Sequence, residues 1–148
     1  MIPEDSMPPD DIDPWLDLLL SYRIEPHLGR QRATFIYDYP ASQAALAKIR
    51  PGDPPLAERF ELYINGIELA NGFYELSDAT EQRRRFEADN KHRVERGLPE
   101  IPIDERFLAA LPDLPPCAGV ALGIDRLVML AAGKTAIDEV IAFSSERA

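Results

Sequence analysis

Apolar and polar residues alternate with a period of two over residues 60–64, in the middle of the chain. The dipeptide Asn65-Gly66 follows directly, and both of its residues tolerate the positive φ that a two-residue turn between antiparallel strands requires. After this dipeptide the chain continues with "ELANGFYEL" (68–76), which predicts a second strand. The pattern therefore predicts a β-hairpin centred on residues 65 and 66.

Two further strands and three helices are predicted outside this hairpin. "TFIYDYP" (34–40) is apolar and ends at a proline, which is typical of a buried strand leading into a loop, and "GVALGI" (119–124) predicts another strand. Apolar residues at helical spacing, bounded by capping and stop residues, predict the helices. They extend from the N-cap Asp13 to just before Pro26, from the N-cap Asp78 to Gly97, and from Asp125 to about Gly133.

Proline and acidic residues are concentrated at the start of the chain. Four of the 14 prolines lie within the first 14 residues, beside a run of carboxylates. Such a segment buries too little apolar surface to order itself, so residues 1–11 are predicted to form a disordered tail. The remainder, residues 12–148, has the length of one domain.

Composition narrows the function classes. The 16 basic and 26 acidic residues give a net charge of −10, which repels nucleic acid and makes tRNA an unlikely partner. No apolar run approaches the roughly 20 residues of a membrane span. A single cysteine, Cys117, excludes an internal disulfide, and with two histidines it cannot form the usual zinc site. We therefore expect a cytoplasmic protein that does not enter the membrane.

The predicted hairpin carries two glutamates on one face. In an ideal register residue 63 faces 68 and residue 61 faces 70, so Glu61 and Glu68 are diagonal neighbours about 7 to 8 Å apart. Carboxylate oxygens at this spacing suit an Mg²⁺ ion that also binds phosphates. The alternative, which the spacing alone favours, is a solvated hairpin face with two glutamates that bind nothing.

Asn71, Phe73 and Glu75 alternate along the second strand. An amide, an aromatic ring and a carboxylate together can bind an ammonium group. In the ideal register this trio lies on the face opposite Glu61 and Glu68, so either the two sets act separately or a bulge near residues 70–72 unites them. An edge strand with outward polar residues remains the alternative.

The "GVALGI" strand has one nearly bare face, formed by Gly119, Ala121 and Gly123. A bare strip lets a flat ligand approach closely, and Arg126 just beyond it can bind a phosphate. Alternatively, the strip only allows the next helix to pack closely, with Asp125 as its cap.

Longer strings of the sequence resemble a known family. "RFELYINGIELANGFYEL", followed by "GVALGIDRLVML", resembles the C-terminal part of a class II aminoacyl-tRNA synthetase core of the lysyl type, with the second string similar to motif 3. "TFIYDYPASQAALAKI", "ERFELYINGIELANGFYELSDATEQRRRFEADN" and "EVIAFSSERA" resemble the synthetase-like lysine ligases that modify elongation factor P. The resemblance covers nearly everything after the acidic tail.

The resemblance implies an α+β fold in which helices flank an antiparallel sheet that binds ATP and Mg²⁺. It implies activation of lysine, preferably β-lysine, as an adenylate, and transfer to a lysine of elongation factor P rather than to tRNA. Carried over by position, the implied site comprises Glu61 and Glu68 for metal and ATP, Arg126 for ATP and for catalysis, Asn71, Phe73 and Glu75 for lysine, and Ala121 beside the activated amino acid.

The chain also departs from the family pattern. Nothing in it resembles motif 1, which supplies the homodimer interface, or motif 2, which supplies the arginine for the α-phosphate and the substrate carboxylate. We therefore expect residues 12–148 to be a partial catalytic domain that is inactive alone. The alternatives are a fragment of a genuine lysyl-tRNA synthetase and a non-catalytic module that binds a partner or dimerises through an exposed strand edge.

Overall fold

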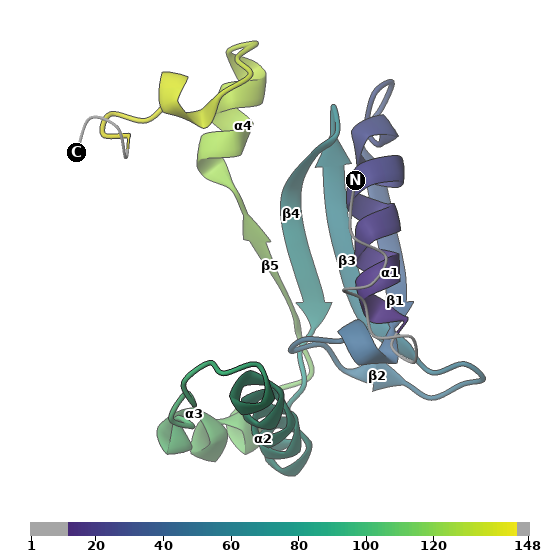
Figure 1. The fold of residues 1–148 in the computed structure, drawn as a ribbon, viewed down its shortest axis with the longest axis vertical. Helices are drawn as coiled ribbons and strands as arrows, with labels where there is room; N and C mark the ends of the chain where they lie inside the picture. The colour runs from purple at the N-terminus through teal and green to yellow at the C-terminus, as the bar shows by residue number, and fades with distance from the viewer. Residues whose placement is uncertain (1–11, 145–148) are drawn as a thin grey trace.

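The computed structural model of the protein describes residues 12–144. The predicted tail of residues 1–11 lies outside this range. The described residues form one antiparallel sheet with helices around it, so the prediction of an α+β fold is confirmed (Figure 1). No helix in this part of the chain is long and apolar enough to cross a membrane.

Within the described residues, five strands form the sheet, and all its ladders are antiparallel. The order across the sheet is β1-β3-β4-β5, and the short β2 pairs with the beginning of β3. The strands are β1 (Thr34–Pro40), β2 (Ile49–Arg50), β3 (Leu56–Ile64), β4 (Ile67–Tyr74) and β5 (Ala118–Leu122).

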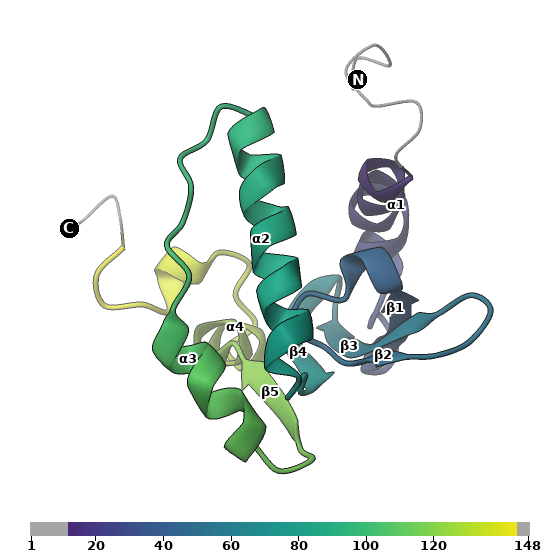
Figure 2. The same ribbon diagram turned by 90° about the horizontal axis from the view of Figure 1, so that it is seen from below.

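The helical segments lie at three places around the sheet (Figures 1 and 2). One continuous rod lies beside β1 and β3, a helix pair lies at one end of the sheet, and a further helix follows β5 at the other end. The rod comprises α1 (Asp13–Leu19), the π-helical η2 (Leu20–Ile24) and the 3-10 turn η3 (Glu25–His27). The pair is α2 (Ala79–Glu95) and α3 (Glu105–Ala110), the further helix is α4 (Ile124–Ala131), and the shorter 3-10 turns are η4 (Ala41–Gln43), η5 (Leu111–Asp113) and η6 (Ile137–Glu139).

The predicted hairpin is confirmed in β3 and β4. Asn65 and Gly66 have φ of 54° and 77°, the left-handed conformation that this two-residue turn needs. Their backbone amides donate to the carbonyls of Gly29 and Leu28 at 3.0 and 2.7 Å. The segment that follows η3 therefore holds the tip of the hairpin.

Helix α2 begins and ends where its sequence predicts. The Asp78 carboxylate accepts hydrogen bonds from the backbone amides of residues 80 and 81, and Gly97 follows the helix at φ 72°. Arg85 donates to Glu81 and to the carbonyls of Ala45 and Ala47. This arginine fastens α2 to the loop before β2.

The expected N-cap of the first helix is wrong. Ile12 is the N-cap residue, and Asp13 lies inside the helix, where its carboxylate accepts a hydrogen bond from Ser42 Oγ at 2.8 Å. The predicted end before Pro26 also needs correction, because the helical path continues through η2 and η3 and places that proline in a 3-10 turn. A proline near the start of a 3-10 turn loses no hydrogen bond, so it does not stop the path.

Strand β1 exists as predicted, but one of its faces is not buried. Phe35 and Tyr37 are 55% and 69% exposed, and across the ladders they lie on the same face as Val120 and Leu122, which are 63% and 45% exposed. We call this the outer face. The strand was expected to be buried because it is mostly apolar and aromatic, but no described element covers its outer side.

The core lies on the opposite face of the sheet. Its buried cluster consists of Tyr39, Ala44, Ala47 and Ala57, with Phe73 among the side chains packed against it. A register shift around Asp38, which has φ 62°, turns Tyr39 away from the outer face. The loop through η4 therefore packs beneath the same face that carries the candidate site, which we call the site face.

Glu81 should make stability depend on acid pH. Hydrogen bonds from Arg84 and then Arg85 lower the pKa of Glu81 from 4.5 to about 2. A carboxyl with a lowered folded pKa stabilises the fold above its unfolded pKa, and this contribution disappears as pH falls through about 2. Glu81→Gln should cost on the order of 1 kcal/mol at pH 7 in urea unfolding, and this difference should shrink between pH 5 and pH 2.

Glu105→Gln provides the control, because Glu105 also pairs with an α2 arginine, Arg83, but its side chain is 65% exposed. It should change the free energy of unfolding little at any pH. A Glu81→Gln difference that stays constant from pH 7 to pH 2 would contradict the prediction.

Candidate active site

The site depends on an irregularity in the β3–β4 ladder. Tyr63 pairs with Glu68 as in an ideal hairpin, but Glu61 pairs with Asn71 instead of residue 70. The extra residue is Leu69, which has no partner across this ladder. This is a β-bulge, and it lies one residue before the range 70–72 in which a bulge was expected.

The bulge brings the two predicted sets of residues onto one face. Beyond it, Asn71 and Phe73 have the same orientation as Glu61, and on β5 they pair with Ala121 and Gly119. The bulge therefore places Asn71 and Phe73 on the same face as Glu61 and Glu68, and the arrangement with the two sets on opposite faces is wrong.

Glu75 joins the same face just beyond the end of β4. Its carboxylate lies over Gly119, where a Cβ added to the glycine would overlap Oε1 of Glu75. Strand β5 has no side chain at this position, which leaves space for the carboxylate. The bare strip thus admits a side chain of the site itself, while Ala121 beside it stays exposed.

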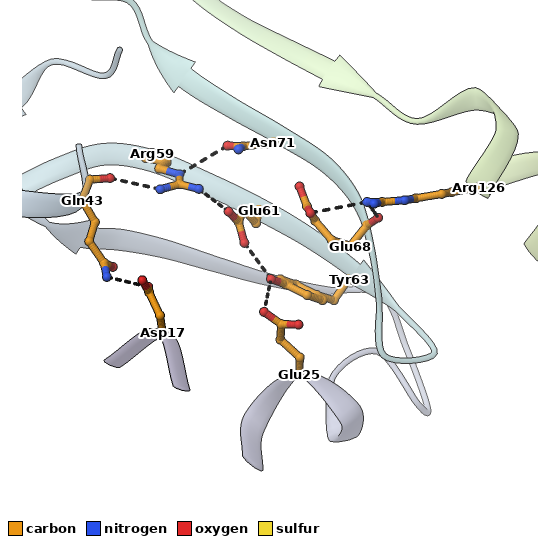
Figure 3. A network of polar contacts seen from close by, with 9 residues as sticks. All are labelled: Asp17, Glu25, Gln43, Arg59, Glu61, Tyr63, Glu68, Asn71 and Arg126. Carbon is orange, nitrogen blue, oxygen red and sulfur yellow. Dashed lines mark hydrogen bonds and ion pairs between the residues drawn. The ribbon is translucent and has the colours of Figure 1, made fainter. Parts of the chain in front are cut away.

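Arg59 occupies the middle of the site face and was missed by sequence reasoning (Figure 3). It forms an ion pair with Glu61, which is only 6% exposed. The guanidinium carbon of Arg59 lies 4.4 Å from the centre of the Tyr39 ring. The available signal was the spacing of Arg59 and Glu61: they are two residues apart, so they share a face once the predicted strand is extended back past residue 60.

Glu61 is held from its other side by a phenol. The Tyr63 hydroxyl donates to Oε2 of Glu61 at 2.6 Å, and Oε1 of Glu25 lies 3.2 Å from the same hydroxyl oxygen. Burial, followed by the hydrogen bond and negative charge of Glu61, raises the pKa of Tyr63. Burial and the charge of Glu61 also raise the pKa of Tyr39. Both phenols therefore remain protonated at neutral pH.

Arg126 reaches the site from the first turn of α4. Its Nη1 donates to the carbonyl oxygen of Glu68 at 2.7 Å and lies 3.4 Å from Oε2 of the same residue (Figure 3). The helix is capped by Gly123 without a side-chain hydrogen bond, so the reading of Asp125 as its cap is wrong. The backbone amide of Gly123 donates instead to the carbonyl of Leu69 at 2.9 Å.

A cleft of about 650 Å³ opens between the α1–η3 rod and the site face. Arg59 is the one basic residue among its lining residues, whereas the lining carboxylates are Asp13, Asp17, Glu25, Glu61 and Glu68. This excess of negative charge favours a cationic ligand or a metal ion. Asn71, Phe73 and Glu75 do not line this cleft, so the predicted lysine-binding set lies on the site face outside it.

Residues 12–144 contain no cluster of three or more His, Cys, Asp or Glu side chains arranged to hold a metal ion. Glu61 and Glu68 nevertheless fit one kind of metal site. Mg²⁺ commonly binds through one or two carboxylates and takes its remaining ligands from water and substrate phosphates. The pair is thus suited to Mg²⁺ that arrives with a nucleotide.

Comparison with known proteins identifies the family of the chain. The chain belongs to the class II tRNA synthetases (D, K and N), whose family model matches residues 17–147. Within that class it is similar to proteins named elongation factor P–(R)-beta-lysine ligase. It is 60% identical to the protein of Klebsiella pneumoniae (strain 342) over 140 residues and 61% identical to that of Proteus mirabilis (strain HI4320) over 137 residues.

These matches cover 94% and 92% of this chain but only 43% and 42% of the two relatives. The chain thus spans less than half the length of the curated relatives it matches. The resemblance to the synthetase-like ligases is therefore confirmed at the level of the family.

The position of Glu75 can be tested at Gly119. Gly119→Ala should displace the Glu75 carboxylate and shift its side-chain ¹³C resonance. Because the obstructing atom is the end of a flexible side chain, the free energy of unfolding should fall by less than about 1 kcal/mol. Overpacking a rigid core typically lowers it by about 1 to 3 kcal/mol.

Gly72→Ala is the matched comparison on the neighbouring strand. A Cβ at Gly72 would lie 2.5 Å from the Phe60 ring and 2.8 Å from the carbonyl oxygen of Gly119, so this variant should cost about 1 to 3 kcal/mol. An unmoved Glu75 resonance in Gly119→Ala would show that the carboxylate does not lie over Gly119.

Proposed function

We propose that this chain forms the motif 3 part of an ATP-dependent ligase that activates lysine, preferably β-lysine, as an adenylate. The proposed acceptor is a lysine of elongation factor P, in the cytoplasm. The observation that carries the proposal is the Leu69 bulge, which unites the carboxylates and the lysine-binding trio on one face. The names of the relatives support the substrate and the acceptor.

Glu61 and Glu68 are the proposed residues for Mg²⁺ and ATP. Mg²⁺, when bound, supplies positive charge to the phosphates of ATP. Arg126 adds a guanidinium at the same end of the site, and its 47% exposed side chain is free to turn from Glu68 toward a phosphate. These residues stabilise the charge that develops when the lysine carboxylate attacks the α-phosphorus and pyrophosphate leaves.

Glu75 is the proposed partner of the substrate's side-chain ammonium. No ion pair of Glu75 with a basic side chain occurs among the described residues, and its carboxylate lies beside the open strip of β5. The Phe73 ring can make a cation–π contact on the same face, because the Arg59 guanidinium carbon already lies 5.9 Å from the centre of this ring. The Asn71 amide lies between Glu61, its partner on β3, and the positions of Phe73 and Glu75.

Another polypeptide segment is proposed to complete the site. The relatives are more than twice as long as the matched region. Among residues 12–144, no strand pairs with the outer edge of β5, so this edge and the outer face offer backbone groups and apolar side chains to a further segment. The same exposed surfaces favour a second candidate, a non-catalytic module that dimerises through them. Sedimentation analysis distinguishes the two, because such a module would form a stable dimer without ATP or lysine.

The isolated 148-residue chain should form no lysyl adenylate. Groups that stabilise the α-phosphate and the substrate carboxylate are proposed to lie outside it, and each such group is typically worth about 3 to 4 kcal/mol. ATP–pyrophosphate exchange should be absent with lysine and with β-lysine. Co-expression with the part of the Klebsiella pneumoniae relative that this chain does not span should restore it.

Robust exchange by the purified chain alone would overturn the need for a second segment. Absence of exchange in a folded, co-purifying complex of the two parts would overturn the ligase assignment. The complex with Glu61→Gln serves as the inactive control.

Ala121 should determine the preference between lysine isomers. Its methyl group projects onto the site face beside Asn71, and a methyl group in a close-packed pocket discriminates by about 1 to 3 kcal/mol. In the completed enzyme Ala121→Gly should raise activity with α-lysine relative to β-lysine. Glu75→Ala should weaken both isomers alike, because both share the side-chain ammonium.

Steady-state activation kinetics with both isomers measure these effects. An unchanged isomer ratio in Ala121→Gly would remove this residue from the specificity argument. A Glu75→Ala variant that affects one isomer only would contradict the shared ammonium site.

A further inference from the structure

Arg59 connects three separate elements of the site through its three guanidinium nitrogens (Figure 3). Nη2 pairs with Glu61 on β3, Nη1 donates to the carbonyl of Gln43 in η4 at 3.0 Å, and Nε donates to Oδ1 of Asn71 on β4 at 3.4 Å. The side chain is only 18% exposed and stacks on the Tyr39 ring. Its orientation is therefore fixed from several directions.

This contact determines which way the Asn71 amide points. A guanidinium has only donors, so the atom of Asn71 that faces Arg59 must be the amide oxygen. The NH₂ group of Asn71 is then turned away from Arg59. Without the arginine, the two ends of the amide could exchange places at little cost.

Arg59 also fixes the buried carboxylate of Glu61. One oxygen of Glu61 accepts a hydrogen bond from Arg59 and the other accepts one from Tyr63, so the carboxylate is not free to rotate. Each oxygen keeps a second lone pair for a ligand. A lysine at position 59 would preserve the positive charge, but its single nitrogen cannot contact Glu61, Gln43 and Asn71 together.

We propose that Arg59 is a positioning residue: it sets the direction of the Asn71 amide and of the Glu61 carboxylate, two groups that bind ligands if the proposed function holds. It acts through these two groups and does not itself contact the reacting atoms. Its own contacts, to a backbone carbonyl and an aromatic ring, supply the rigidity that this role requires.

The first experiment reads the Asn71 side chain by NMR in the ¹⁵N-labelled chain. The heteronuclear NOE of Asn71 Nδ2 should be high in the unsubstituted chain and should fall in Arg59→Lys toward the value of Asn65, which lies exposed in the hairpin turn. Arg85→Lys is the matched control, because Arg85 is similarly buried at 13% exposure and also donates to a glutamate and to backbone carbonyls. It should leave the Asn71 signals unchanged.

A reciprocal variant covers the case in which Arg59→Lys does not fold. In Asn71→Leu the Nε–H resonance of Arg59 should shift, because its acceptor has been removed. An unchanged Asn71 NOE in folded Arg59→Lys, or an unchanged Arg59 Nε–H resonance in Asn71→Leu, overturns the inference.

The second experiment measures lysine activation by the completed enzyme. Arg59→Lys should raise the KM for lysine at least about tenfold while its thermal midpoint stays close to that of Arg85→Lys. An unchanged KM overturns the positioning role. If the unsubstituted complex shows no activation, the proposed function fails, and the NMR experiment still decides whether Arg59 orients Asn71.

Discussion

A single extra residue in β4, the bulge at Leu69, determines which side chains of the sheet share a face. Side chains alternate along a strand, so Leu69 reverses the face of every residue after it in the β3–β4 ladder. Without the bulge, Asn71 and Phe73 would lie on the outer face, away from Glu61. The bulge also positions α4, because the Leu69 carbonyl accepts the backbone amide of Gly123, the N-cap of that helix. Arg126 then reaches Glu68 from the first turn of α4. The two ends of the site are thus linked by one backbone irregularity.

The electrostatics of the site follow from burying a carboxylate beside others. Glu61 is almost inaccessible to water, and an unpaired buried charge is strongly unfavourable, so it requires a nearby cation and donors. Arg59 and Tyr63 meet this requirement on opposite oxygens. The cleft as a whole stays acidic, because five carboxylates and one basic side chain line it. Such a site keeps its buried carboxylate paired and still attracts positive charge, which suits a cationic ligand or a metal ion.

Local chemistry in the sequence predicts the hairpin turn and the start of α2, because Asn65-Gly66 and Asp78 act on their own neighbours. The exact position of the bulge has no such local signature: Leu69 is one of several apolar residues in β4, and Gly123, which contacts its carbonyl, is distant in sequence. Arg59 was missed for a related reason, because its role depends on a carbonyl and a ring from residues distant in sequence. The burial of β1 was overestimated since an apolar strand does not reveal which of its faces will be covered.

The two faces of the sheet have different requirements. The core of Tyr39, Ala44, Ala47 and Ala57 packs under the site face, so the geometry of Arg59 and Glu61 depends on contacts made within the described chain. On the outer face, Phe35, Tyr37, Val120 and Leu122 are exposed together. Burying this apolar area would stabilise the fold by about 25 cal/mol per Å². Covering that face would therefore add stability without rearranging the site on the other side. The chain spans less than half the length of its relatives, yet it can hold the residues of the candidate site in place, because its own core supports them from beneath.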